Sequence, residues 1–174
     1  VSGAGSQWNM TDSIVVGGGQ SAAILVQDNA VVVSNGGVLG LSAGVTGTAT
    51  VSGDGSLWNN YSPLNHFDVG FQGNGILSIN SGGDMFSGFA KLGVNSGASG
   101  NATVTGNGST WTLDGHLLVG YQGSGDVTVS DAGQINFQPN SWLNVGEQAG
   151  SKGVVTVTGN ASSISVPNSQ SIRV

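Results

Sequence analysis

The sequence predicts an all-β fold in which the chain coils into a parallel β-helix (a β-solenoid) of about seven rungs, a rung being one turn of the coil. Three observations predict this fold. An eight-residue motif, Val-(Ser/Thr)-Gly-x-Gly-Ser-x-Trp, occurs at residues 1–8, 51–58 and 104–111, and such internal repetition is typical of solenoids. Short segments alternate apolar and polar residues, as strands with one buried face do. Glycine is abundant, at 32 of 174 residues, and only 7% of residues are charged, a composition that does not favour helices.

The spacing of equivalent residues gives a repeat of 50 residues. The motifs that begin at Val1 and Val51 are 50 residues apart, whereas the motif at Val104 follows Val51 by 53 residues. Comparison of equivalent positions places one three-residue insertion within residues 59–66 and a second within residues 134–142. Each repeat divides into two similar halves of about 25 residues, a length that suits one rung of a coil. The repeat unit therefore corresponds to two rungs.

Strands are expected where apolar residues alternate within each half-repeat. Ala102 and Val104 flank Thr103, and the same pattern recurs in the other repeats. The apolar residues should face the core, and the hydroxyl residues between them should form an outward ladder, because β-branched side chains suit a strand surface. Equivalent residues should then stack in two columns, one of Trp8, Trp58 and Trp111 and one of Thr50, Thr103 and Thr156.

Charge excludes several classes of partner. The net charge is −6, and the only cations are Lys91, Lys152 and Arg173, so the basic surface that nucleic-acid binding requires is missing. No run approaches 18 apolar residues, so we expect no membrane insertion by this segment. Val1 falls inside a repeat. We therefore expect residues 1–174 to be a single β-helix segment excised from a longer chain.

The repeated motifs resemble the passenger-domain repeats of Gram-negative autotransporters, the proteins of type V secretion. Residues 51–58, 69–79 and 92–104 carry the resemblance, with copies on either side that cover nearly all of the chain. The resemblance implies a right-handed parallel β-helix from a longer passenger domain. It also implies a location outside the outer membrane, either displayed on the bacterial surface or secreted.

The residues do not predict an enzyme. Most of the nine acidic residues lie in glycine-rich turn segments, such as those around Asp54, Asp84 and Asp114, where turn formation alone explains them. Asp68 occupies an outward position. His66 and His116 share a register two rungs apart, or about 10 Å, which is too far to share one metal ion. We therefore expect no catalytic residues, no metal and no cofactor.

The two insertions are the predicted binding site, because loops on a rigid scaffold are where recognition groups usually lie. Both combine proline with aromatic rings, and the predicted contact residues are Tyr61, His66, Phe137 and Trp142. The alternative is that these rings fold back and cover the coil. Outside the insertions, Met85, Phe86 and Phe89 are interpreted as core filling.

The predicted function is adhesion, that is, binding to host or bacterial surface molecules. The expected partner is a host receptor, extracellular matrix, a glycan or a second copy of the chain. Three alternatives stay open: a secreted ligand that engages a host receptor and signals, a structural spacer, and a carbohydrate-active β-helix enzyme. The resemblance does not distinguish them, because the repeated residues are those that build the coil.

Overall fold

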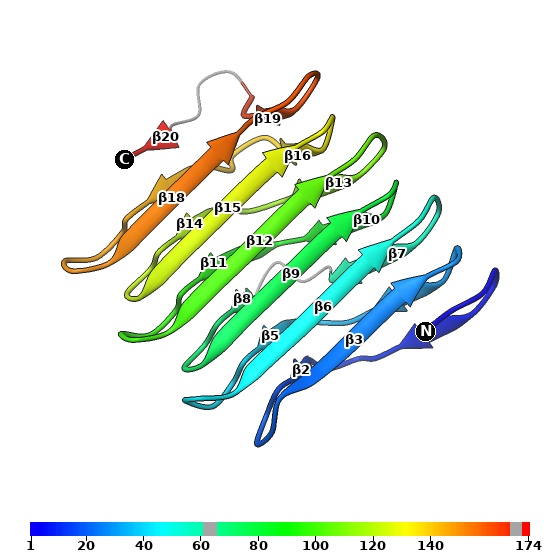
Figure 1. Ribbon diagram of the computed structural model, residues 1–174, viewed down its shortest axis with the longest axis horizontal. Helices are drawn as coiled ribbons and strands as arrows, with labels where there is room; N and C mark the ends of the chain where they lie inside the picture. Colours follow the sequence, from blue (N-terminus) through cyan, green and yellow to red (C-terminus); the bar gives the residue numbers. More distant parts are fainter. Residues whose placement is uncertain (61–65, 168–171) are drawn as a thin grey trace.

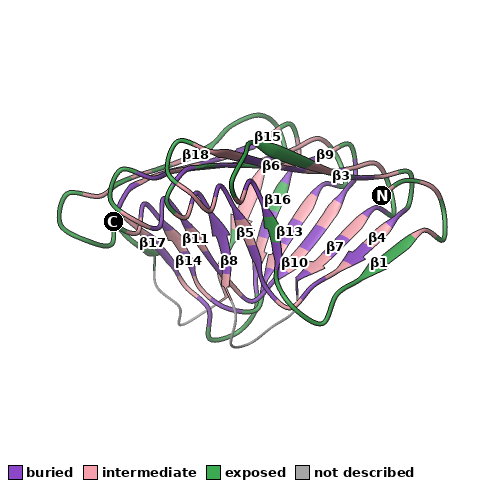
Figure 2. Cartoon of the chain, turned by 90° about the horizontal axis from the view of Figure 1, so that it is seen from below, coloured by how far each residue is buried: buried purple, intermediate pink, exposed green. Residues whose placement is uncertain are grey.

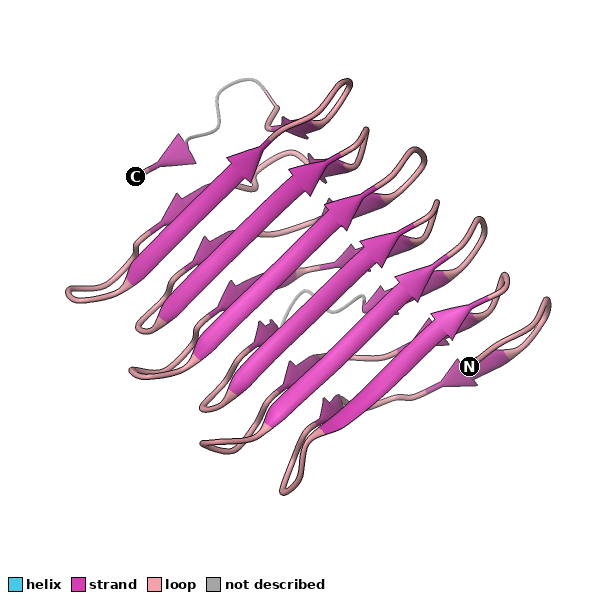
Figure 3. Cartoon of the chain, viewed as in Figure 1, coloured by secondary structure: helices cyan, strands magenta, loops and turns pink. Residues whose placement is uncertain are grey.

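The computed structural model describes residues 1–60, 66–167 and 172–174, and it confirms the predicted all-β parallel β-helix (Figure 1). The twenty elements of the described residues are all strands (Figure 3). They form three sheets in which each strand pairs in parallel with the strands of the neighbouring rungs. The described part of the chain holds no helix that is long and apolar enough to cross a membrane.

Each rung contributes one strand to each sheet. The first sheet contains β1 (Gln7–Asn9), β4 (Val31–Val33), β7 (Leu57–Asn60), β10 (Asp84–Ser87), β13 (Thr110–Leu113), β16 (Gln134–Phe137) and β19 (Ser163–Ser165). The second sheet contains β2 (Ile14–Val16), β5 (Gly37–Leu39), β8 (His66–Val69), β11 (Phe89–Leu92), β14 (Leu117–Val119), β17 (Leu143–Val145) and β20 (Ile172–Arg173). The third sheet contains β3 (Ala22–Gln27), β6 (Thr46–Ser52), β9 (Asn74–Asn80), β12 (Ser99–Thr105), β15 (Ser124–Ser130) and β18 (Lys152–Val157). The coil thus completes six rungs, and β19 and β20 belong to a seventh.

The predicted side-chain columns are present. In the first sheet, strand register places these residues in one inward column: Trp8, Val32, Trp58, Met85, Trp111, Ile135 and Ile164. In the third sheet, these residues form one outward column: Leu25, Thr50, Ser78, Thr103, Thr128 and Thr156. The 50-residue repeat therefore places a tryptophan on every second rung from the first to the fifth.

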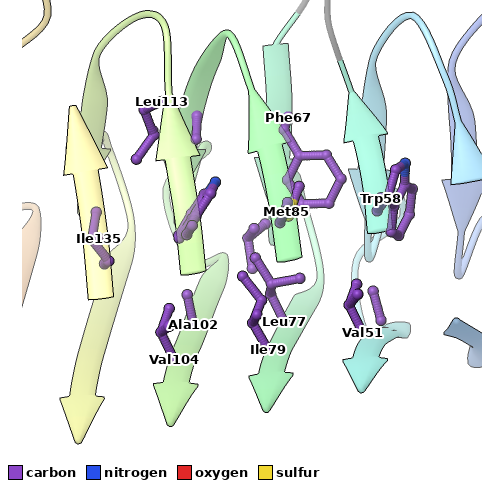
Figure 4. Close-up of a cluster of buried hydrophobic side chains, with 14 of the residues drawn as sticks. Val51, Trp58, Phe67, Leu77, Ile79, Met85, Ala102, Val104, Leu113 and Ile135 are labelled. Atoms are coloured by element: carbon purple, nitrogen blue, oxygen red, sulfur yellow. The ribbon is translucent and has the colours of Figure 1, made fainter. Parts of the chain in front are cut away.

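Apolar side chains from all three sheets form one continuous core, and Figure 2 shows that buried residues recur along the strands of the coil. Trp58 and Phe67, from the first and second sheets, are fully buried and meet edge to face with ring centroids 5.3 Å apart (Figure 4). Val104 of the third sheet is also fully buried. Because each rung is narrow, most core contacts are made within a rung and with the rungs on either side.

The hydrogen bonds between rungs explain the serine and the tryptophan of the repeated motif. The hydroxyl of Ser109 accepts a hydrogen bond of 3.0 Å from the backbone N–H of Gly82, in the rung before it. Ser56 and Ser162 accept equivalent bonds from the preceding rungs. The indole Nε1 of Trp111 donates to Ser87 Oγ at 2.9 Å, as Trp58 does to Ser34. The motif thus supplies partners for buried polar groups that would otherwise be unsatisfied.

The glycines of the repeat fill the corner between the second and third sheets. Gly70 has a φ of +77°, and a Cβ there would lie 2.0 Å from the backbone oxygen of Ser99 in the next rung. A Cβ on Gly100 would lie 2.1 Å from the oxygen of Val69. The backbones of successive rungs therefore approach so closely at this corner that only glycine fits.

Replacing Val104 with aspartate tests the strand register. The side chain of Val104 is fully buried, so Val104→Asp would place an unpaired charge in the core. We expect it to lower the free energy of unfolding by at least about 3 kcal/mol, measured by urea denaturation. Thr103→Asp, at the adjacent outward position of the same strand, should cost less than about 1 kcal/mol. Equal effects of the two substitutions would contradict the register.

Candidate functional site

A column of aromatic side chains lies on the outward face of the second sheet. It consists of His66, Phe89, His116 and Trp142, which we call the ring ladder. Each member directly precedes a buried inward residue, namely Phe67, Ala90, Leu117 and Leu143. The alternation of strand side chains therefore turns all four rings outward, and all four are half-buried.

The rings of the ladder contact one another across four consecutive rungs. His66 and Phe89 meet edge to face at a centroid distance of 5.6 Å. Phe89 and His116 do the same at 4.7 Å, with an interplanar angle of 88°. His116 and Trp142 are stacked, with their planes 17° apart. Edge-to-face contacts suit the charge distribution of aromatic rings, and the stacked pair of His116 and Trp142 extends the contact to the fourth rung, so the ladder is a continuous column of rings.

The two insertions end at the two ends of the ring ladder. His66 is the last residue of the first insertion window, and Trp142 is the last residue of the second. Phe89 and His116 come from the two rungs between them. Phe89 pairs in register with His66, and His116 directly precedes Leu117, which pairs with Ala90. The last residues of the two insertion windows therefore lie on one face of the coil.

A second outward column runs beside the ladder, two residues further along each strand. It consists of Asp68, Lys91, Leu118, Asn144 and Arg173, which we call the polar column. Asp68 is only 9% exposed and Asn144 only 6%. The Oδ1 atoms of both side chains are buried without a hydrogen-bond partner. Lys91 lies over the ring of Tyr121 at 4.8 Å from its centroid, and Arg173 lies over Trp142 at 5.8 Å.

Burial shifts the pKa values of three residues on this face toward their neutral forms. Desolvation raises the pKa of Asp68 from 3.8 to about 6, although the charge of Lys91 acts in the opposite direction. Burial lowers the pKa of His66, and Lys91 lowers it further. Burial also lowers the pKa of His116. Both histidines are therefore neutral near pH 7, and Lys91 and the carboxylate of Asp68 offset each other in adjacent rungs.

The structure brings together part of the predicted site. His66 and Trp142 lie at the two ends of the ring ladder, whereas Tyr61 lies outside the described residues. Phe137 is not an exposed contact residue. It ends β16, pairs in register with Leu113 and is only 5% exposed, because the insertion begins after it and the strand keeps its alternation.

Two members of the ladder, Phe89 and His116, were not among the predicted contact residues. The interpretation of Phe89 as core filling is wrong, because its ring faces outward while the adjacent Ala90 is buried. Met85 does lie in the core, fully buried as predicted. The shared register of His66 and His116 was the sequence signal that pointed to this column.

The histidines of the ladder do not converge on a metal site. The ring of Phe89 lies between His66 and His116, in contact with both. Within residues 1–60, 66–167 and 172–174, no three His, Cys, Asp or Glu side chains form a group that could hold a metal ion. Of the acids, Asp68 lies in the polar column, and Glu147 accepts a hydrogen bond from Asn144 Nδ2 beside it. The ring ladder therefore offers a contact surface, and the polar column beside it offers hydrogen-bonding groups.

Comparison with known proteins finds a relative whose description names no activity. The chain is 37% identical over 123 residues to an uncharacterized lipoprotein, YdeK, of Escherichia coli K12. The matched region is 70% of this chain but only 9% of the relative, so the chain spans a small part of that protein's length. No family model and no solved structure matches the chain.

The raised pKa of Asp68 predicts a specific dependence of stability on pH. Between about pH 4 and pH 6 the folded protein holds a proton on Asp68 that the unfolded chain has released, so stability falls as the pH rises through this window. Asp68→Asn removes this loss of stability, because asparagine does not titrate. We expect the variant to be more stable than the wild type at pH 7.5, by up to about 3 kcal/mol, and equally stable at pH 3.5.

Chemical denaturation at the two pH values measures this difference. The titration of the ladder histidines is common to both proteins and largely cancels in the comparison. Asp114→Asn, at an exposed turn between β13 and β14, controls for the loss of one carboxylate. If Asp68→Asn had the same free energy of unfolding as the wild type at both pH values, the carboxylate of Asp68 would not be desolvated.

Proposed function

We propose that this chain is a binding segment of a cell-envelope protein, in which a rigid β-helix presents the ring ladder for adhesion to host or bacterial surface molecules. The observation that supports the proposal is the ladder itself. Four half-buried rings from four consecutive rungs touch one another on one outward face. Exposed rings on a regular scaffold are common at binding surfaces.

The scaffold suits the ladder to binding because it fixes the rings in advance. The backbone of each ladder residue lies in or beside a strand that pairs with both neighbouring rungs; for example, β11 pairs with β8 and with β14. The rings also restrain one another. Little side-chain or backbone freedom is then lost when a partner binds, so more of the contact energy appears as affinity.

The cell-envelope location rests on two observations. The relative from Escherichia coli is described as a lipoprotein, which suggests an envelope location for the region that the two proteins share. The repeated motifs resemble those of autotransporter passengers, which supports the finer proposal of a segment exposed outside the outer membrane or secreted. A segment in that position meets surface molecules of hosts or of other bacteria.

Adhesion of purified protein tests the proposed function. Beads coated with the 174-residue chain are counted on cultured epithelial cells and on immobilised Gram-negative bacteria. We expect the double variant His66→Ala, Trp142→Ala to reduce bead attachment at least tenfold, because it removes both ends of the ladder. Trp8→Ala is the matched control, since Trp8 is the first residue of the inward column of the first sheet, is 40% exposed at that end and lies outside the ladder.

The outcomes separate the alternatives. Thermal unfolding of each variant shows whether the fold is retained, so that lost attachment can be assigned to the surface. A wild-type chain that attaches to neither surface would favour the spacer. Attachment that is unchanged in a folded double variant would place the binding surface elsewhere. A change in epithelial cell behaviour on addition of soluble chain, without attachment of beads, would favour the signalling ligand.

A further inference from the structure

We propose that the ring ladder and the polar column together bind an unbranched, uncharged glycan that lies along the axis of the coil. This inference rests on the proposed function and specifies the ligand of the same face. Three properties of the face support it: its strands bond to one another between rungs, its rings come from one position on each of four consecutive rungs, and its charged and polar side chains lie in the next outward column.

The ladder lies on the face of a sheet and not at its edge. The backbone groups of its residues are used between rungs, as in the hydrogen bonds from Ala90 N to His116 O and from Leu117 N to Trp142 O. An extended peptide gains affinity on a sheet by adding a strand to a free edge, and that route is closed here. A ligand on this face must therefore be recognised by side chains alone.

The repeat of the rings suits a linear polymer. Neighbouring strands lie about 4.8 Å apart, so the four rings extend over about 14 Å along the coil axis. This spacing is close to the length that one pyranose unit adds to an extended β-linked chain. Because His116 and Trp142 stack on each other and Phe89 meets both histidines edge to face, the C–H groups of successive sugars would rest against the outward side of the contacting rings, which offers apolar surface without a deep pocket.

The polar column supplies the groups that sugar hydroxyls require. Lys91 is a donor in the middle of the face, one rung from Asp68 and two rungs from Asn144. Asp68 Oδ1 and Asn144 Oδ1 are buried acceptors without a partner, and leaving a buried acceptor unpaired is unfavourable. A rotation that brings Asp68 Oδ1 to the surface would pair it with a ligand hydroxyl, whereas Asn144 is held by the hydrogen bond that its Nδ2 donates to Glu147.

The charges favour a neutral glycan over an acidic one. The chain carries a net charge of −6, which repels polyanions such as sulfated glycans. On the face itself Lys91 has Asp68 beside it in register, and Arg173 pairs in register with Asn144, which is hydrogen-bonded to Glu147, so two cations stand against two acids. Burial keeps both ladder histidines neutral by lowering their pKa, so they add no positive charge near pH 7.

Binding to immobilised oligosaccharides at pH 7.5 tests the inference. The panel contains the neutral linear hexasaccharides cellohexaose, chitohexaose, laminarihexaose and maltohexaose, together with a sulfated heparin hexasaccharide. We expect binding to at least one neutral hexasaccharide, with affinity reduced at least tenfold by Trp142→Ala and by Phe89→Ala. Trp8→Ala should bind as the wild type does. Thermal unfolding confirms that each variant is folded.

A second arm separates this inference from the proposed function. Beads coated with the chain are applied to epithelial cells treated beforehand with mild periodate, which oxidises glycans, or with trypsin, which removes surface protein. Ladder-dependent attachment that falls after periodate supports a glycan ligand. Attachment that survives periodate and is lost after trypsin, with no neutral hexasaccharide bound, would overturn the glycan while leaving adhesion through the ladder intact. Binding of heparin alone, or binding unaffected by Trp142→Ala and Phe89→Ala, would also overturn it.

Discussion

In-register hydrogen bonding between the backbones of successive rungs is the constraint on which the rest of this structure depends. Parallel strands bond only when equivalent residues lie side by side, so every rung must trace nearly the same path. Stacked side-chain columns follow directly, as the alternation of Trp58, Met85 and Trp111 shows. The close corner follows as well, because at Gly70 and Gly100 one rung passes within van der Waals contact of the next.

The same constraint decides where function can be added. An extra residue inside a strand would turn every following side chain to the opposite face, so the insertions are confined to the connections between the first and second sheets. Both return to the common path at the same position, which is that of His66 and Trp142. The ring ladder therefore combines variable connections with a column whose spacing the backbone fixes. The backbone of the coil makes the ring ladder rigid. The residue at one position of each rung decides which side chain the ladder presents there.

Most of the fold was predictable because the repeat encodes it at several levels. Glycines mark the corners, alternation marks the strands, and the 50-residue spacing marks the register, so the columns of Trp58 and Thr103 could be predicted from the sequence. The site was predictable only in part. Phe137 was misplaced because a length comparison locates an insertion only within a window, and the structure shows that the regular strand extends through Phe137. Phe89 was misplaced because the path of the chain at Gly88 decides which face the next strand presents, and the pattern of apolar residues does not reveal that path.

The alternation of large and small residues in the tryptophan column has a consequence for how such a chain can change its length. The two rungs of a unit are not interchangeable: one supplies the indole, and the rung before it supplies the serine acceptor, as Ser34 does for Trp58 and Ser87 for Trp111. Loss of the rung between two tryptophans, or duplication of a tryptophan rung, would bring two indoles into adjacent positions of a column about 4.8 Å apart and leave one of them without its acceptor. Gain or loss of a whole pair would keep the alternation and leave each indole next to a serine acceptor. A coil of this kind can therefore gain or lose two rungs at a time without repacking its core. The size of the tryptophan side chain sets that step.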